Sequence, residues 1–286
     1  MPHIVDTLIE ERAEELMKHP ALWRLVTRLL YPVLGYHEAV RMADAVAEMG
    51  GLEIFEMLSE RLKLDIDLSG AEHVPASGSA VVTANHPTGI ADGVAVFDAL
   101  RTVRSDITLF ANRDAIRFAP GLADMIVPVE WVDDKRTHAR NRETVSHMVR
   151  AFRAGRLIVI FPSGRLARPT ARGLVERGWT PTAVNLAQKY RCPIVPMNIR
   201  GRNSWLYYLL YAINTELKDM TLFRELLNKV GQPYRIRIAE PFEPQGDARM
   251  LTMALREFVA DAMPTGRQRF TVSDTDTLAP APYRSS

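Results

Sequence analysis

The hydrophobic positions of residues 20–34 follow helical spacing. Pro20 suits the first turn of a helix, where its missing N–H is not needed. Apolar residues then recur three or four positions apart, whereas Arg24 and Arg28 fall on another face. The apolar set is Leu22, Leu25, Val26, Leu29, Leu30 and Val33. Pro32 is expected to kink or end the helix. Such a stripe fits either core packing or a membrane surface, and the pattern leaves both open.

A second helical pattern covers residues 37–62. We expect it to break at Gly50 and Gly51, because glycine is the weakest helix former after proline. Together the two patterns predict a helical N-terminal piece over residues 1–60, for which association with a membrane is one interpretation.

From residue 61 the pattern changes to short apolar runs that alternate with helical stretches. Strand-like runs lie at 63–70, 78–85, 106–112, 125–131, 156–161, 192–199 and 234–240, and helical stretches at 92–103, 139–155, 180–191 and 247–263. This alternation predicts an α/β domain over residues 61–263, a mostly parallel sheet covered by helices. Residues 264–286 are rich in Pro, Ser, Thr and Asp and are expected to be a disordered tail.

Composition narrows the classes of function. A formal net charge of +2 over 286 residues argues against a nucleic-acid binder. Cys192 is the single cysteine, which excludes an internal disulfide and a cysteine-based zinc site and fits a reducing cytoplasm. The N-terminus lacks the order of a secretory signal. No uninterrupted apolar run reaches the ~18–20 residues of a spanning helix, so we expect a chain that can lie on a membrane without crossing it.

The segment TANHPTGIADGVAV, residues 83–96, places His86 and Asp92 on a tight turn after a predicted strand. Ligand sites of open parallel sheets lie at the carboxyl ends of the strands. Gly89 would let the backbone fold back so that the two side chains meet. An imidazole accepts a proton well when its other nitrogen is hydrogen-bonded, and a carboxylate can supply that bond. The turn therefore predicts a general base, His86, oriented by Asp92.

A structural interpretation of the same turn stays open. His86 could be a packed residue after a strand, Asn85 could form an Asx-turn and Asp92 could cap the following helix.

Three segments in order carry a family resemblance. NHPTGIADG at 85–93 resembles the first motif of the glycerolipid acyltransferase family, the glycerol-3-phosphate and lysophosphatidate acyltransferases. FPSGRLARP at 161–169 resembles the third motif, and CPIVPMNIRGRNS at 192–204 resembles the fourth. Five residues between His and Asp, where the commoner form has four, resemble the haemolysin-like, ornithine-lipid acyltransferase branch. The resemblance spans about residues 62–244.

The resemblance implies a glycerol-3-phosphate acyltransferase-like fold and a direct acyl transfer. His86 would deprotonate an acceptor hydroxyl or amine, which attacks an acyl thioester of acyl carrier protein (ACP) or coenzyme A (CoA). The expected acceptor is a lipid, with no metal, no cofactor and no nucleic acid. Backbone N–H groups around 162–165 are candidate oxyanion donors. The substrate-binding residues that the resemblance and the anion-binding side chains suggest are Asn85, Gly89, Arg113, Phe161, Pro162, Ser163, Gly164, Arg165 and Arg168.

The chain also departs from the family pattern. Ser163 stands where the third motif usually has a Glu thought to hold the acceptor, and Glu130 stands near the usual Arg of the second motif. Arg113 matches that motif's early basic position. Arg165 and Arg168 could grip an anion or be solvated surface residues. The basic segment 133–142 could dock an acidic carrier or anionic headgroups, or be an exposed loop.

We therefore expect a cytoplasmic enzyme, peripheral on the inner membrane, that moves a fatty acyl group to a lysolipid, aminolipid or glycerophosphate. Trp205, Tyr207 and Tyr208 suit a membrane interface or an acyl groove, with core packing as the alternative. Two rival functions remain: a hydrolase that uses the same base to activate water on a lipid ester or thioester, and a non-catalytic lipid-binding module.

Overall fold

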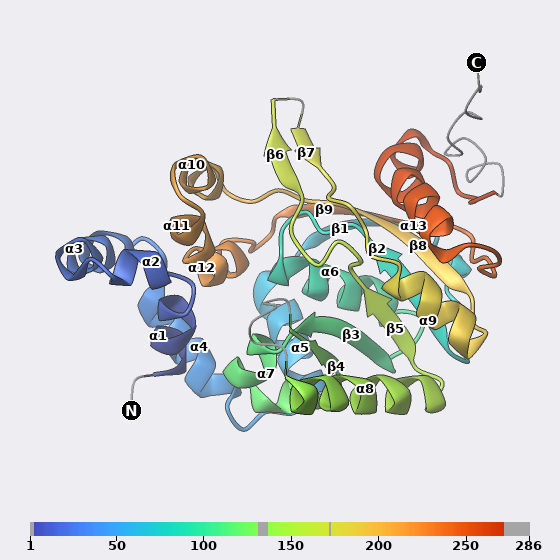
Figure 1. The fold of residues 1–286 in the computed structure, drawn as a ribbon, viewed down its shortest axis with the longest axis horizontal. Coiled ribbons are helices and arrows are strands. Elements are labelled where there is room, and N and C mark those ends of the chain that lie inside the picture. Colours follow the sequence, from blue (N-terminus) through green and yellow to red (C-terminus); the bar gives the residue numbers. More distant parts are fainter. Residues whose placement is uncertain (1–2, 131–136, 172, 272–286) are drawn as a thin grey trace, which may run out of the picture.

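The computed structural model describes residues 3–130, 137–171 and 173–271 (Figure 1). It confirms the predicted α/β architecture, in which helices flank a mostly parallel sheet. Within these ranges the larger sheet has seven strands in the order β1-β9-β8-β2-β5-β3-β4. They are β1 (Asp65–Ser69), β2 (Ala80–Ala84), β3 (Ile107–Asn112), β4 (Ile126–Val129), β5 (Leu157–Ile160), β8 (Ile194–Arg200) and β9 (Pro233–Ile238).

The strands β8, β2, β5, β3 and β4 run parallel to one another. β9 is antiparallel to β8, and β1 follows the direction of β9. The central strand β2 lies between β5 and β8, with Thr83 beside Ile160 on one side and Pro196 on the other. The three strands therefore end at the same edge of the sheet, where the segments 85–93 and 161–169 begin and where the segment 192–204 leaves β8.

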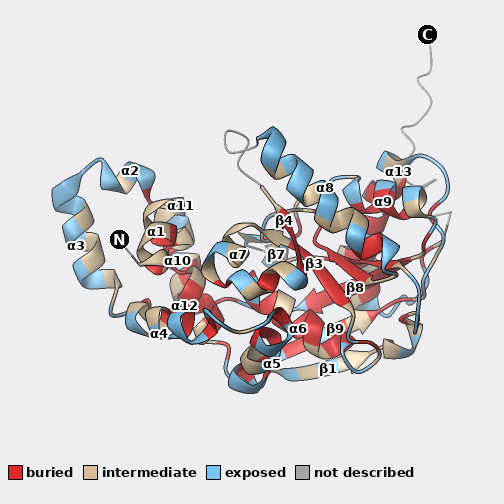
Figure 2. Cartoon of the chain, turned by 90° about the horizontal axis from the view of Figure 1, so that it is seen from below, coloured by how far each residue is buried: buried red, intermediate tan, exposed pale blue. Residues whose placement is uncertain are grey.

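Helices cover both faces of the sheet, which explains why the central strands are continuous apolar runs. Alternate residues of β2 enter different cores, Val82 on one face and Val81 on the other. The first core includes α4 (Tyr36–Val46), α5 (Gly51–Leu62) and α6 (Ile90–Leu100), and the second includes α8 (His138–Arg153), α9 (Thr182–Tyr190) and α13 (Ala248–Glu257). Figure 2 shows buried residues gathered in the strands and on the sheet-facing sides of helices.

Shorter elements complete the domain. They are η1 (Ala71–His73), α7 (Asp114–Phe118), η2 (Pro120–Asp124), the hairpin of β6 (Arg168–Thr170) and β7 (Gly173–Val175), the π-helical turn η4 (Phe258–Ala262) and η5 (Met263–Thr265). The stretch 247–263, predicted as a single helix, thus changes form after Glu257.

The N-terminal helices pack against helices from much later in the chain (Figure 1). The N-terminal helices are α1 (Ile4–Glu10), α2 (Glu14–Met17), α3 (Pro20–Leu30) and α4, and the later ones are α10 (Trp205–Ile213), α11 (Thr215–Asp219) and α12 (Leu222–Leu227). Among them α2 lies against α11, and α4 lies against α12. The carboxylate of Glu216 on α11 accepts hydrogen bonds from the backbone N–H groups of Glu15 and Leu16, each at 2.9 Å. The helix predicted after Pro20 ends at Leu30, before Pro32.

The predicted domain limits stay predictions. Residue 60 falls inside α5, whose Phe55 packs on Phe97 of α6 with ring centroids 5.0 Å apart. At the other end, Phe270 is buried against Phe242 and Phe258, so the described start of the expected tail is packed. The rest of that tail, 272–286, lies outside the described residues.

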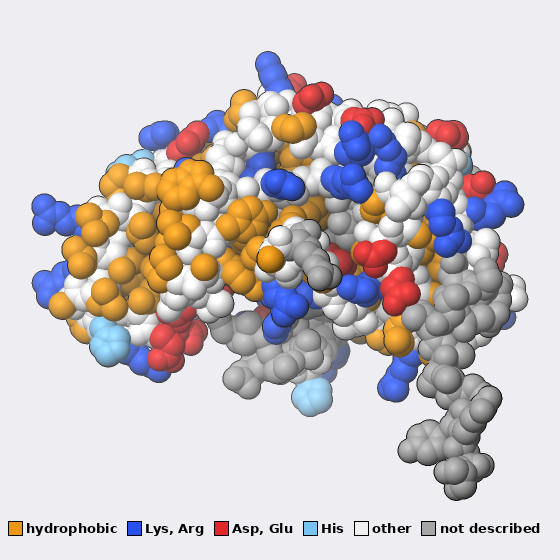
Figure 3. Space-filling model, turned by 90° about the horizontal axis from the view of Figure 1, so that it is seen from above, with side chains coloured by type: hydrophobic (Ala, Val, Ile, Leu, Met, Phe, Trp, Pro, Cys, Tyr) orange, Lys and Arg blue, Asp and Glu red, His pale blue; other side chains and the backbone are white. Residues whose placement is uncertain are grey.

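An apolar end surface is exposed on α3, the turn after it and α10. Its members are Leu22, Leu25, Leu29, Val33, Trp205, Leu209 and Ile213. Figure 3 shows hydrophobic side chains gathered at the end of the molecule that carries these helices. Much of the apolar stripe of residues 20–34 thus faces outward, and its contact with a membrane stays a prediction. None of the helices in the described ranges has the length and apolarity needed to span a bilayer.

Candidate active site

His86 lies just beyond the carboxyl end of β2, and its imidazole meets the carboxylate of Asp92. The Nδ1 atom is 2.9 Å from Oδ2 of Asp92. An ionised carboxylate only accepts hydrogen bonds, so Nδ1 carries the proton and the lone pair of Nε2 is left to act as a base. The Asp92 side chain is 0% exposed, whereas that of His86 is 18% exposed and can be reached from outside.

Asp92 lies in the first turn of α6 and is saturated with donors. Its Oδ2 atom also accepts from the backbone N–H groups of Thr88 (2.8 Å) and Gly89 (3.0 Å), and Oδ1 accepts from the Thr88 hydroxyl. The positive end of the helix favours the charge further. The N-cap residue of α6 is Gly89, and Asp92 at the third helical position completes a capping box with it while also holding the His86 ring. The capping role therefore does not exclude the catalytic one, which stays a prediction.

Tyr234 of β9 extends this network, a contact that no local pattern in the sequence indicates. Its hydroxyl is 2.8 Å from Oγ1 of Thr88. Since the single hydroxyl hydrogen of Thr88 goes to Asp92, Tyr234 is the donor to Thr88. Burial raises the pKa of Tyr234 far above its usual value, which keeps that donor protonated.

Two glycines make the turn possible. Gly89 has φ +100° and ψ −130°, a conformation that residues with a Cβ rarely adopt. Gly201, directly after β8, permits a close approach: a Cβ there would lie 2.7 Å from Cε1 of Tyr234. The segment 192–204, which resembles the fourth motif, thus leaves space for the Tyr234 ring, whose hydroxyl bonds to Thr88.

Asn85 holds the end of β2 to β8. Its Nδ2 donates to the carbonyl of Ile199 (2.8 Å), and its Oδ1 accepts from the N–H of the same residue (2.7 Å). Both polar ends of the side chain are used in this way, so the structure assigns Asn85 a contact with the sheet where the sequence suggested a substrate contact.

The segment 161–169, which resembles the third motif of the family, contacts His86 through Phe161 and Ala167. The ring of Phe161 stacks on the imidazole with centroids 4.4 Å apart, and the N–H of Ala167 donates to the His86 carbonyl at 2.8 Å. Within the predicted oxyanion donors, Pro162 has no N–H and Gly164 donates to the Phe161 carbonyl at 3.0 Å. The N–H groups of Ser163 and Arg165 remain as the candidates.

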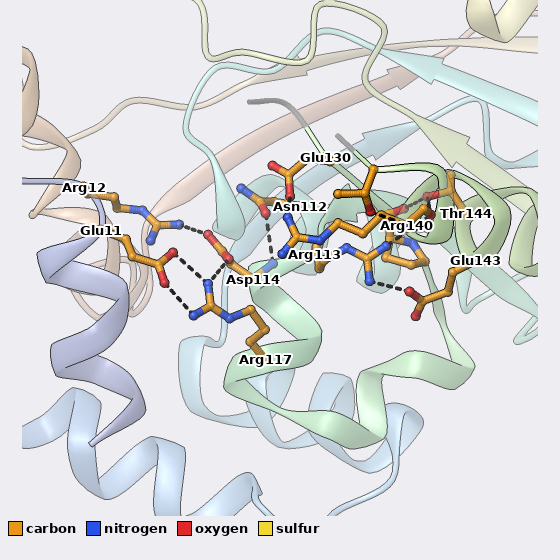
Figure 4. Close-up of polar contacts among 12 residues, drawn as sticks. Glu11, Arg12, Asn112, Arg113, Asp114, Arg117, Glu130, Arg140, Glu143 and Thr144 are labelled. Atoms are coloured by element: carbon orange, nitrogen blue, oxygen red, sulfur yellow. Dashed lines mark hydrogen bonds and ion pairs between the residues drawn. The ribbon is translucent and has the colours of Figure 1, made fainter. Parts of the chain in front are cut away.

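The three candidate arginines lie in different surroundings. Arg165 and Arg168 are exposed, Arg168 at the base of the β6–β7 hairpin that projects from the domain in Figure 1. Arg113 donates to Glu143 at 2.5 Å and to the carbonyl of Arg140 at 3.4 Å (Figure 4). The structure therefore places Arg113 in an ion-pair network, and its anion-binding role stays a prediction.

The same network includes Glu130, which accepts from Arg140 at 2.9 Å. Of the basic segment 133–142, residues 133–136 lie outside the described residues. Nearby, Arg12 and Arg117 pair with Asp114, and Arg117 also pairs with Glu11, fastening the N-terminal helices to α7 (Figure 4).

Glu176 is a site residue that the sequence analysis missed. The residue is buried, with 7% of its surface exposed. One carboxylate oxygen accepts from the His86 backbone N–H (3.3 Å) and the other from Nε1 of Trp179 (3.0 Å). Burial raises the pKa of Glu176, and the bonds from Trp179 and the His86 N–H, together with an interaction with the Ser163 hydroxyl, oppose that rise. Glu176 is 90 positions from His86, so no local motif could have indicated the contact.

A metal centre finds no support in residues 3–130, 137–171 and 173–271, where no three His, Cys, Asp or Glu side chains are grouped to hold an ion. What the site offers is a partly exposed imidazole with a buried carboxylate behind it. This arrangement can take a proton from a hydroxyl and return it to a leaving group.

Comparisons with known proteins identify the family of the chain. Residues 65–200 match the family model described as Acyltransferase. The chain is similar to the lyso-glycine lipid O-acyltransferase of Phocaeicola vulgatus, with 24% identity over 220 residues, 74% of this chain and 77% of the relative. The lyso-glycine lipid O-acyltransferase of Bacteroides thetaiotaomicron is 22% identical over 206 residues, 72% of this chain and 73% of the relative.

One solved structure is similar over most of the chain. It is the 1-acyl-sn-glycerophosphate (LPA) acyltransferase PlsC from Thermotoga maritima, at a TM-score of 0.48 and 14% identity, covering 94% of this chain and 100% of that one.

Proposed function

Because this chain belongs to the glycerolipid acyltransferase family and is an acyltransferase of lipid metabolism, we propose that it moves a fatty acyl group from a thioester donor to a hydroxyl of a lysolipid. The donor is acyl-ACP or acyl-CoA. The observation that carries the proposal is the 2.9 Å contact between Nδ1 of His86 and the buried Asp92 carboxylate.

The proposed reaction uses His86 twice. Nε2 takes the proton of the acceptor hydroxyl while its oxygen bonds to the thioester carbonyl carbon. When the tetrahedral intermediate collapses, the C–S bond breaks and the imidazolium returns the proton to the leaving thiolate. Asp92 stabilises the imidazolium between these steps. General-base assistance of this kind is worth about 10²–10⁴-fold in rate.

The acceptor proposed is a lysolipid with an amino-acid headgroup, acylated on oxygen. Support comes from the two relatives, both lyso-glycine lipid O-acyltransferases. The branch to which the first motif is similar also favours an aminolipid acceptor over a free glycerophosphate.

Contact with a membrane is proposed through the apolar end surface. Burial of exposed apolar groups is worth about 0.8 kcal/mol per CH₂, so a stripe of leucines and a tryptophan can hold the protein on a bilayer. Arg24 and Arg28 of α3 are exposed and would attract anionic headgroups. The acceptor could then be taken from the membrane on which the enzyme lies, at the cytoplasmic face of the inner membrane.

The test measures thiol release from acyl-CoA and from acyl-ACP, with and without lyso-glycine lipid or lyso-ornithine lipid. Release that requires the lysolipid, with the diacyl product seen by mass spectrometry, supports transfer. Release at the same rate without acceptor identifies a hydrolase and refutes the proposal. Lysophosphatidate is the control acceptor. If the enzyme acylates it faster than the amino-acid lysolipids, the acceptor is a glycerophosphate and the proposed aminolipid acceptor is wrong.

A further inference from the structure

We propose that Glu176 is a positioning residue for the reaction: its buried carboxylate fixes the backbone of His86. The inference rests on the function proposed above for His86. It starts from the polar groups of the His86 main chain, which face the segment 166–179 that follows the third motif-like turn. The His86 carbonyl accepts from Ala167 at 2.8 Å, and the His86 N–H donates to Oε2 of Glu176 at 3.3 Å.

The chemistry of the contact requires a carboxylate. Glu176 meets two N–H donors, the His86 N–H and the indole N–H of Trp179, and neither can become an acceptor. The Ser163 hydroxyl also interacts with this carboxylate, and a hydroxyl can either donate or accept. A carboxylate offers one accepting oxygen to each. A glutamine offers one oxygen and one NH₂ group, so one donor would face another donor in a buried place. Such a mismatch is costly because the unpaired groups cannot turn to water.

Glu176 is itself held rigidly. Arg256 of α13 donates to the carbonyl of Glu176 at 2.6 Å and to that of Arg177 at 3.0 Å. The Arg177 side chain returns to the carbonyl of Leu166 at 3.0 Å. These hydrogen bonds connect α13 to residues 176–177, then to residues 166–167, and finally to the main chain of His86. We call this chain of hydrogen bonds the bracket. Asp92 therefore fixes the imidazole through Nδ1, while the bracket fixes the main chain that carries it.

The first variant is Glu176→Gln. A displacement of about 1 Å in a catalytic group can cost about 10²-fold, so we expect kcat to fall about 10- to 100-fold. The KM values for donor and lysolipid should stay within about twofold, because Glu176 contacts the base and neither substrate. A kcat within twofold of the wild type, or a loss expressed only in KM, would overturn the inference.

The decisive variant is the pair Glu176→Gln with Trp179→Phe. Phenylalanine removes the competing N–H, so the glutamine oxygen is free to accept from His86 and its NH₂ group no longer faces a donor. The double variant should regain most of the kcat lost in Glu176→Gln, whereas Trp179→Phe alone should lose only about threefold or less. A double variant as slow as Glu176→Gln, or slower, would refute the positioning role. If Glu176→Gln does not fold, the kcat of the double variant is compared with that of Trp179→Phe. Similar values support the positioning role, and a much lower value in the double variant refutes it.

A readout without substrate separates this inference from the proposed function. In protein labelled with ¹⁵N-histidine, the His86 amide peak is identified by its loss in His86→Ala. We expect it to move upfield in Glu176→Gln and to return in the double variant. An unmoved peak refutes the contact whatever the enzyme's substrate. A moved peak in a protein without lysolipid-dependent transfer would refute the proposed function and leave the contact standing.

Discussion

The turn around His86 and the apolar end surface on α3 and α10 break the usual rule of burial in opposite ways. The turn buries a carboxylate completely, and the end surface exposes Leu25 at 54%, Leu29 at 61% and Trp205 at 73%. A buried charge and a large exposed apolar patch are the two observations that most often mark function.

The difference lies in what completes each region. Asp92 finds all its donors inside the protein, from Thr88, Gly89 and His86, so the turn is rigid before any substrate arrives. The leucines of α3 have no comparable cover in the part of the chain that the structure describes, which is why we propose that a membrane covers them. One region is therefore suited to chemistry and the other to attachment, and each can be disturbed without the other.

The largest effect is expected from His86→Ala. Removal of the base should lower kcat by about 10⁴-fold, the upper end of the range for general-base assistance. Binding to lipid vesicles, measured by sedimentation, should not change. Retained turnover would show that the turn is only structural.

Asp92→Asn should lower kcat by about 10²-fold, because the amide oxygen can still accept the three N–H donors but carries no charge to stabilise the imidazolium. The free energy of unfolding should fall by only about 1 kcal/mol. Asp92→Ala is the control for the capping role, since it leaves the Thr88 and Gly89 N–H groups unpaired and should cost more stability, measured by urea unfolding. Equal stability of the two variants would contradict the bonding described.

The double change Leu25→Glu with Leu29→Glu tests the end surface. Vesicle affinity should fall at least about tenfold, because each leucine loses roughly 1.5–3 kcal/mol of burial in the bilayer. Stability should shift by no more than about 0.5 kcal/mol per site, since both side chains are exposed. Val145→Glu, an exposed apolar position on α8, is the matched control, and an equal loss of binding there would mean that no specific surface is involved.

The smallest effect is expected for Arg168→Ala. An exposed charge contributes about 0.2–1 kcal/mol, so the KM for donor or acceptor should rise by no more than about fivefold, and less at high salt. Arg153→Ala, an exposed arginine on α8, serves for comparison. Identical kinetics for the two variants would show that Arg168 is a solvated surface residue with no role in substrate binding.

The sequence alone determined the local parts of this protein. His86 and Asp92 are six positions apart, and a glycine-rich turn between an apolar strand and a helix is enough to bring them together. Alternating apolar runs likewise predicted the strands of the larger sheet and its mostly parallel arrangement under a cover of helices, because periodicity reflects which side of an element is buried.

Only the tertiary structure decided which distant residues support that turn. Glu176, Ile199 and Tyr234 reach it across 90, 114 and 146 positions, through the order in which β5, β2, β8 and β9 are joined. It also paired Arg113 with Glu143 and turned the leucines of α3 outward. The physical reason is that strand order and helix docking close long loops, and the spacing of residues along the chain does not record which ends such loops bring together.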